Sequence, residues 1–317
     1  GAVRVCGPLL AGAALMGSML GQPAALPAGG GVKGLWCIAP GLCWWLERAS
    51  GRGQTQLTAG QAAFLRLLAR RTWSFFEAYV TEGDNWLPPD NFQQYPEPKV
   101  AHRTSPTNIG LSLLANLSAR DFGYITLDRL LDRTTKTLTT LNKMERYRGH
   151  LYNWYDTQTL NPLAPRYVSS VDSGNLAGHI LTLKAGLDQL SSRPILEPAF
   201  FTGLGDCLEL ILESDRATGL VLSTETLKPL KRLMEQAANL RPWNLTQVHG
   251  QLEILLECAQ ELSNACATPA EEANISQFDW WLQCFVRQCR DGLNDLILFA
   301  PWSGDRPGQD KFRLPEL

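Results

Sequence analysis

A succession of helix-like segments dominates this sequence from Thr58 onward. Apolar residues recur at intervals of three and four, as in Phe64, Leu67 and Leu68, which is the periodicity of a helix with one buried face. We find no convincing run of alternating apolar and polar residues of the kind that forms a half-buried strand. The pattern predicts an all-α fold built as an array of helical hairpins with short connections.

Capping signals mark where the helices begin. A capping box starts at Thr58, and Ser105 precedes a proline in the first turn of the second helix. Gly149 is expected to terminate the third helix. Gly174 and Gly178, one turn apart in the fourth helix, predict close packing of a neighbouring helix. The eight predicted helices lie at about residues 58–80, from 104 onward, 126–146, 169–190, 197–215, 224–239, 245–267 and 274–298.

The first 48 residues differ in composition from the rest. No charged residue lies between Val5 and Val32, and the uncharged stretch 34–46 contains three tryptophans. Neither run alone quite reaches the roughly 20 apolar residues of a spanning helix, although tryptophans suit the membrane interface. A membrane helix and a signal peptide with Arg4 as its basic region both stay open. The small and polar residues 49–56 are expected to form a linker.

Composition argues against several classes of function. The formal net charge of −2 and the lack of a long Lys/Arg run give no electrostatic reason to expect nucleic acid. The eight cysteines have no CxxC spacing, so we expect reduced core residues rather than a zinc site. His102, His150 and His179 also lack the spacing of a zinc site. We therefore expect neither a metal nor another cofactor in this segment.

Aromatic residues gather with Asp, Asn and Pro in two segments that are expected to be loops. One is residues 85–92 (NWLPPDNF) and the other is residues 152–156 (YNWYD). A flat aromatic ring beside fixed hydrogen-bonding groups suits a sugar, which has an apolar C–H face and a rim of hydroxyls. The same rings would also hold the loops against the core, and for any single residue both roles stay open.

Four consecutive blocks of the chain carry a family likeness. They read RTWSFFE (71–77) with NWLPPDNF (85–92), AHRTSPTNIGL (101–111), ERYRGHLYNWYD (145–156) and YVSSVDSGNLAGH (167–179). In order and spacing they resemble the start of the glycoamylase-like domain of the cyclic β-1,2-glucan synthases, over roughly residues 60–190. The resemblance implies a piece of a bacterial inner-membrane enzyme that makes a β-1,2-glucan from UDP-glucose and cyclises it by transglycosylation.

The resemblance also implies a domain organisation. Residues 1–48 would be a membrane segment, the tail of the transferase region, followed by the linker 49–56. Residues 57–317 would be the N-terminal part of a glycoamylase-like domain on the cytoplasmic side, forming part of an (α/α)6 toroid. Eight helices are fewer than six hairpins require, and the chain starts at Gly1 rather than Met. We expect a fragment whose two catalytic carboxylic acids lie beyond Leu317.

A sugar cleft is expected where loops meet at one mouth of the toroid. Trp154 is the leading candidate for stacking against a sugar ring. Arg103 is expected to pair with Asp156 or Asp172 or to donate to a hydroxyl. Asp172 has a second interpretation as the cap of its own helix. The candidates for glucan binding are Trp86, Asp90, Arg103, Asn108, Tyr152, Asn153, Trp154, Asp156, Asp172 and Asn175.

Two other functions stay open. A stand-alone β-glucan hydrolase would need two carboxyl groups at a suitable separation, which Asp156 with Asp172 or Glu145 would have to supply. A non-catalytic helical scaffold would instead link the transferase to later domains. The expected partners are β-1,2-glucan, the membrane at the N-terminus and the remaining domains of the same parent chain.

Overall fold

The computed structural model describes residues 57–218, 224–238, 244–266 and 276–304, besides five isolated positions between residues 38 and 45. Its internal contacts divide the chain into two units, Gly1–Ala62 and Ala63–Leu317. The predicted membrane segment 1–48 falls almost wholly outside the described residues, and the linker 49–56 entirely so. Among the residues described, none of the helices has both the length and the apolar character that a membrane crossing requires.

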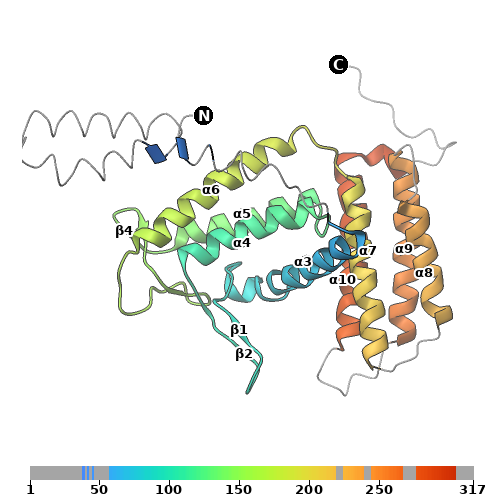
Figure 1. Ribbon diagram of the computed structural model, residues 1–317, viewed down its shortest axis with the longest axis horizontal. Coiled ribbons are helices and arrows are strands. Elements are labelled where there is room, and N and C mark those ends of the chain that lie inside the picture. Colours follow the sequence, from blue (N-terminus) through green and yellow to red (C-terminus); the bar gives the residue numbers. More distant parts are fainter. Residues whose placement is uncertain are drawn as a thin grey trace, which may run out of the picture. The chain divides into compact units, whose positions relative to one another are not determined.

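Helices account for most of the described chain, which confirms the all-α class (Figure 1). Their first residues agree with the predicted starts to within about three positions. Closure of the array into a toroid stays a prediction. The helices are α3 (Ala59–Tyr79), α4 (Pro106–Asp121), α5 (Leu127–Lys143), α6 (Ser170–Leu190), α7 (Pro198–Thr218), α8 (Thr224–Ala238), α9 (Leu245–Cys266) and α10 (Gln277–Phe299). Two short 3-10 helices, η2 (Glu82–Asp84) and η3 (Pro301–Gly304), accompany them.

Local hydrogen bonds explain where the helices begin. The Ser105 hydroxyl accepts the backbone N–H of Asn108 at 3.2 Å and so caps α4.

The end of α5 was predicted wrongly, because the helix stops at Lys143 rather than near Arg146. The chain then enters a two-stranded sheet of β4 (Arg146–Tyr147) and β5 (His150–Leu151). Gly149, with φ of 88°, lies in the turn of that hairpin and does not terminate the helix.

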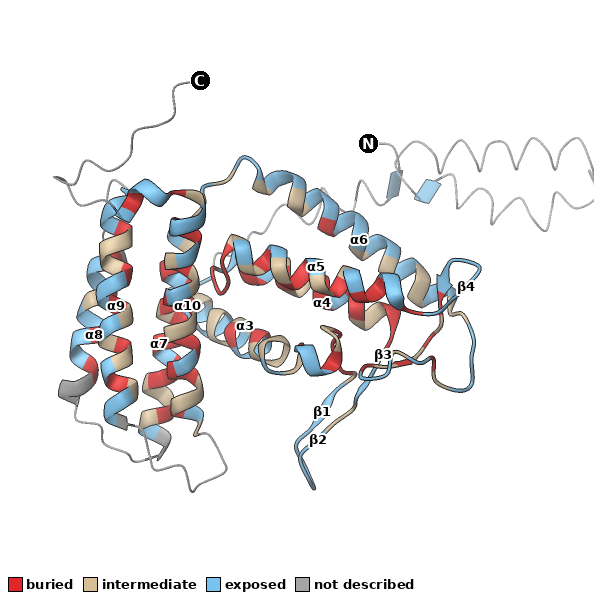
Figure 2. Cartoon of the chain, turned by 180° about the vertical axis from the view of Figure 1, so that it is seen from behind, coloured by how far each residue is buried: buried red, intermediate tan, exposed pale blue. Residues whose placement is uncertain are grey.

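The helices α7 to α10 form a four-helix bundle. α10 packs against α7 and α9, and α8 packs against the same two helices, which closes the arrangement (Figures 1 and 2). Fully buried side chains from the bundle include Phe200, Leu204, Leu252 and Phe285. This core lies in the part of the sequence to which no family block could be assigned.

The helices α4 and α6 approach closely through glycines that the sequence did not single out. A Cβ atom built on Gly110 of α4 would overlap the imidazole of His179 in α6. Gly186 of α6 likewise lies against a leucine of α4. At the predicted packing glycines, Gly174 and Gly178, no atom of another described element lies within 4 Å of such a Cβ, so the prediction of close helix packing there was wrong.

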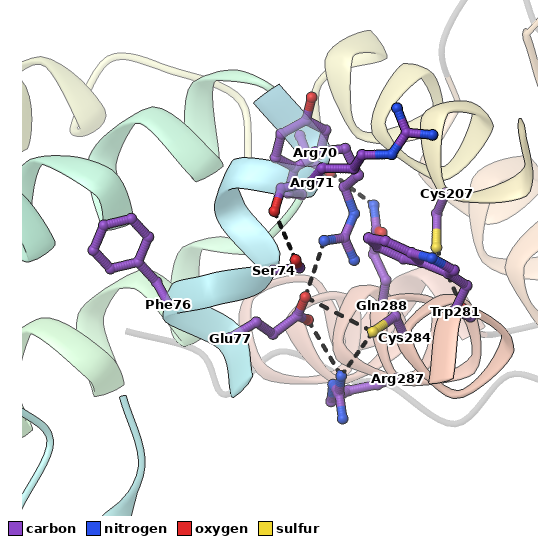
Figure 3. Close-up of polar contacts among 12 residues, drawn as sticks. Arg70, Arg71, Ser74, Phe76, Glu77, Cys207, Trp281, Cys284, Arg287 and Gln288 are labelled. Carbon is purple, nitrogen blue, oxygen red and sulfur yellow. Dashed lines mark hydrogen bonds and ion pairs between the residues drawn. The ribbon is translucent and has the colours of Figure 1, made fainter. Parts of the chain in front are cut away.

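A buried ionic network joins α3 to α10 (Figure 3). The side chain of Arg70 is 1% exposed and donates from Nη1 to Oε2 of Glu77 at 3.0 Å. Arg287 of α10 donates from Nη2 to the other carboxylate oxygen of Glu77 at 3.3 Å. Burial pushes the pKa of Glu77 upward, but Arg70 and Arg287 outweigh it and hold that pKa below its ordinary value. Glu77 therefore has a structural role.

The helix α10 also caps the start of α5. Oδ2 of Asp295 accepts the backbone N–H groups of Leu127 at 3.0 Å and Asp128 at 3.3 Å. These N–H groups have no partner within their own helix. Burial raises the pKa of Asp295 to about 6, although the hydrogen bonds it accepts oppose the rise. In the same region, Gln288 donates to the carbonyl of Gly123 at 2.7 Å.

Short antiparallel ribbons occur in the loops, where no strand was expected. β1 (Phe92–Gln93) pairs with β2 (Lys99–Val100), and β3 (Arg103–Thr104) pairs with β6 (Tyr155–Asp156). In the second ribbon Arg103 lies opposite Asp156, and Thr104 lies opposite Tyr155. The β3–β6 ribbon therefore brings two of the four family blocks side by side.

Candidate functional site

Asp90 organises the loops at the start of α4. Its Oδ2 accepts from Nε and Nη2 of Arg103 at 3.1 and 2.9 Å, and its Oδ1 accepts from Nδ2 of Asn108 at 3.3 Å. The predicted pairing of Arg103 with Asp156 or Asp172 was therefore wrong. Asp156 is a neighbour of Arg103 through the backbone of the ribbon, whereas Asp90 holds its side chain.

The ring of Trp154 lies under the guanidinium of Arg103. The Arg103 Cζ atom is 4.9 Å from the centroid of that ring, which is within the range of a cation–π contact. Trp154 is half-buried, and the side chain of Arg103 is 52% exposed. A planar donor group therefore lies on a partly accessible aromatic ring, fixed in orientation by the carboxylate of Asp90.

A second group of polar side chains joins the starts of α4 and α6. The hydroxyl of Thr107 donates to Oδ1 of Asp172 at 2.6 Å and accepts from Nδ2 of Asn175 at 3.1 Å. Asp172 does not cap its own helix, because the hydroxyl of Ser169 accepts the Asp172 N–H and fills that role. Thr107 was missed by sequence reasoning, although it lies inside the second family block between Pro106 and the candidate Asn108.

Asn153 connects the two groups. In the orientation that satisfies both ends of its amide, Asn153 donates to Oδ2 of Asp172 at 2.9 Å. Its amide oxygen then accepts from Nε1 of Trp154 and from the hydroxyl of Tyr167, each at 2.7 Å. The connected residues are called the loop cluster below: Asp90, Arg103, Thr107, Asn108, Asn153, Trp154, Asp172 and Asn175.

Asp156 has a separate, local role. Its Oδ1 accepts from the backbone N–H of Thr159 at 2.7 Å and of Gln158 at 3.0 Å, which is the pattern of an Asx turn. The hydrogen bond from the Thr159 backbone is the main reason why the pKa of Asp156 lies below its ordinary value. Asp156 and Asp172 are therefore engaged in different networks, Asp156 in its own turn and Asp172 with Thr107 of α4.

Two further candidates face other parts of the structure. Trp86 lies beneath the ammonium of Lys136 in α5, with Nζ 4.2 Å from the ring centroid. Tyr152 donates its backbone N–H to the hydroxyl of Tyr155 at 2.7 Å, and its ring lies 6.0 Å from the guanidinium carbon of Arg166. In the part of the chain that the structure describes, we find no group of three or more His, Cys, Asp or Glu side chains that could hold a metal ion.

The chain shares extended sequence similarity with a known protein. No family model matches the chain. The chain is 42% identical over 205 residues to cyclic beta-(1,2)-glucan synthase NdvB of Rhizobium meliloti. The matched stretch covers 64% of this chain and 7% of that relative, so the chain spans only a small part of the relative's length. The resemblance of this chain to the cyclic β-1,2-glucan synthases is therefore confirmed.

Proposed function

We propose that this chain is part of a cyclic β-1,2-glucan synthase and that its loop cluster binds the glucan. The 42% identity to a protein of that name over 205 residues supports the parent activity. The observation that supports the binding role is the stacking of Arg103 on Trp154, with the guanidinium held in place by hydrogen bonds to Asp90. The parent would make its glucan from UDP-glucose at the bacterial inner membrane, with this helical part on the cytoplasmic side.

The loop cluster has the chemistry that a neutral sugar requires. Glucose offers hydroxyls that both donate and accept, and the cluster holds carboxylates, amides and a guanidinium within hydrogen-bonding distance of one another. Arg103 is half-exposed and its charge is balanced by Asp90, which suits hydrogen bonding to a neutral sugar better than attraction of an anion. Asn175 is exposed beside Thr107 and extends the polar surface along the start of α6.

We assign no catalytic carboxyl group to this chain. A retaining transglycosylase needs one carboxylate as nucleophile and a second carboxyl group as acid and base, about 5–5.5 Å apart. Asp90 and Asp172 are each tied to donors from neighbouring elements, and Asp156 stabilises its own turn. The proposed contribution of this segment is therefore to position the glucan, while other segments of the parent chain supply the chemistry.

Calorimetric titration of the full chain with linear β-1,2-glucan oligomers tests this proposal. Replacing Trp154 with Ala removes the ring beneath Arg103 and is expected to weaken binding about 5- to 10-fold, from aromatic contacts worth about 1 kcal/mol. Trp302→Ala is the matched control, because Trp302 is 59% exposed in η3 and belongs to no part of the loop cluster.

Each outcome has a separate meaning. Equal binding by wild type, Trp154→Ala and Trp302→Ala would contradict the assignment of the cleft to the loop cluster. A folded wild-type chain that binds no oligomer would refute glucan binding by this segment and would favour the scaffold role.

A further inference from the structure

A histidine is held by a buried carboxylate beside the β3–β6 ribbon. His102 Nδ1 lies 2.7 Å from Oδ1 of Asp84, a residue that is 7% exposed. The hydroxyl of Thr157 donates to the same oxygen at 2.5 Å. Since a carboxylate accepts, the proton of the neutral imidazole lies on Nδ1. Nε2 is then the free ring nitrogen of a side chain that is 41% exposed.

The His102–Asp84 pair lies on the opposite face of the ribbon from Arg103. The register pairs Arg103 with Asp156, and side chains alternate between the two faces along each strand. His102 and Thr157, the next residue on each strand, therefore share the other face, where both contact Asp84. The backbone N–H of Thr157 donates to the carbonyl of His102 at 3.1 Å, which extends the ribbon pairing to this position.

Unusual backbone conformations surround this pair. Four non-glycine residues of the described chain have positive φ. Two of them, Asn85 (52°) and Trp86 (60°), directly follow Asp84, and a third, Leu160 (62°), lies three residues after Thr157. Asn85 directly follows Asp84, and its Nδ2 donates to the carbonyls of Thr157 at 2.8 Å and Gln158 at 2.9 Å. Left-handed conformations cost free energy in non-glycine residues and gather at functional sites. The surrounding hydrogen bonds offset that cost and fix the position of Asp84.

These observations have a common explanation in ligand binding. A buried carboxylate, a threonine hydroxyl and a left-handed turn together fix the orientation of one partly exposed imidazole. Such a support is what a binding group needs, because a rigid side chain loses little entropy when it contacts a ligand. Gln158, an exposed residue beside the ring, adds a second polar group at the same place.

We propose that His102 is a second contact point for the glucan, with its Nε2 hydrogen-bonded to a sugar hydroxyl. Asp84 and Thr157 act as positioning residues, which fix the tautomer and the orientation of the ring. The inference rests on the proposed function, since the ligand is the same glucan that the loop cluster binds. An oligomer of several glucose units that follows the edge of the ribbon would contact Arg103 and Trp154 on one face and His102 on the other.

Titration of the full chain with β-1,2-glucan oligomers of increasing length tests the inference. In His102→Asn the amide reaches the position of Nδ1 and keeps the contact with Asp84, but nothing replaces Nε2. In His102→Gln the amide reaches the position of Nε2. We expect His102→Asn to bind the longest oligomers about 3- to 10-fold more weakly, which is equivalent to the loss of one hydrogen bond. Its affinity for the shortest oligomer that wild type binds should be unchanged. Because His102→Gln restores a polar atom at the Nε2 position but loses the contact with Asp84, it should lose less affinity than His102→Asn.

Controls and a direct readout separate the possible failures. His150→Asn, at an exposed histidine of β5, should bind like wild type. The ¹⁵N resonance of Nε2 of His102 should move when the long oligomer is added. If Trp154→Ala weakens binding while His102→Asn does not, the inference is refuted and the proposed function stands. Equal losses in His102→Asn and His102→Gln would also refute it, because the effect would then come from the loop. If the wild type binds no oligomer, both fail.

Discussion

Removal of the Glu77 carboxylate is expected to destabilise the protein far more than removal of an exposed carboxylate that also pairs with α3. In Glu77→Ala the guanidinium of Arg70, whose side chain is 1% exposed, keeps its charge and loses its carboxylate partner. Breaking a buried ion pair from one side costs about 3–5 kcal/mol. Arg287 is 41% exposed and is rehydrated easily, so we expect a value near the lower end, about 3 kcal/mol.

Glu213→Ala is the matched control for this prediction. Glu213 of α7 pairs with Arg71, the residue next to Arg70, but their side chains are 41% and 48% exposed. Pairs of this kind contribute about 0–1 kcal/mol. Urea unfolding followed by circular dichroism would compare the free energies of unfolding of the two variants with that of wild type. Similar losses in both variants, below about 1 kcal/mol, would refute the argument that α3 and α10 share a buried charge.

The pH dependence of the Glu77 effect has a defined sign. The folded pKa of Glu77 lies below its ordinary value of 4.5, so its ionised form favours the folded state. The stabilisation is fully present above the unfolded pKa and is lost as the pH falls through the folded pKa. The difference between wild type and Glu77→Ala should therefore shrink below about pH 4.5, and a difference that grows there would contradict the assignment.

Two further predictions concern helix contacts. Gly110→Ala is expected to lower the free energy of unfolding by about 1–3 kcal/mol, because the new methyl group overlaps His179. Gly174→Ala should raise it by about 0.5–1 kcal/mol, because that helical position is open. In thermal melting, a higher melting temperature for Gly110→Ala than for Gly174→Ala would contradict the packing. The folded pKa of Asp295, about 6, lies above its ordinary value of 3.8, so wild type should lose stability as the pH rises from about 4 to 6. Asp295→Asn should lack that loss, and parallel pH profiles of the unfolding midpoint would contradict the shift.

Local signals predicted the helix starts well. Ser105 and Ser169 cap α4 and α6 through hydrogen bonds that span three residues, so the sequence around each start contains the whole interaction. The end of α5 was missed because no local residue stops it. The chain leaves the helix to form the β4–β5 hairpin, and Gly149 serves the turn of that hairpin.

The sequence predicted which residues gather at the candidate site more reliably than which of them contact one another. Asp90, Arg103 and Trp154 do come together, but the register of the β3–β6 ribbon and the path of the preceding loop decide that Arg103 binds Asp90. No periodicity or motif fixes such a choice. Asp84 was overlooked for the same reason, since its contacts with His102 and Thr157 join residues 18 and 73 positions away.

The cap that α10 provides for α5 has a consequence for the order of folding. Asp295 meets the first N–H groups of α5 across a separation of 168 residues, and Gln288 reaches Gly123 across 165. Contacts of such long sequence separation form late, because a large loop must close before they stabilise anything. During synthesis the start of α5 would leave the ribosome long before its acceptor exists. The last helix of the bundle therefore supplies hydrogen-bond acceptors to a helix that was synthesised much earlier. Chains whose synthesis stops before Asp295 would contain an α5 whose first N–H groups lack this cap.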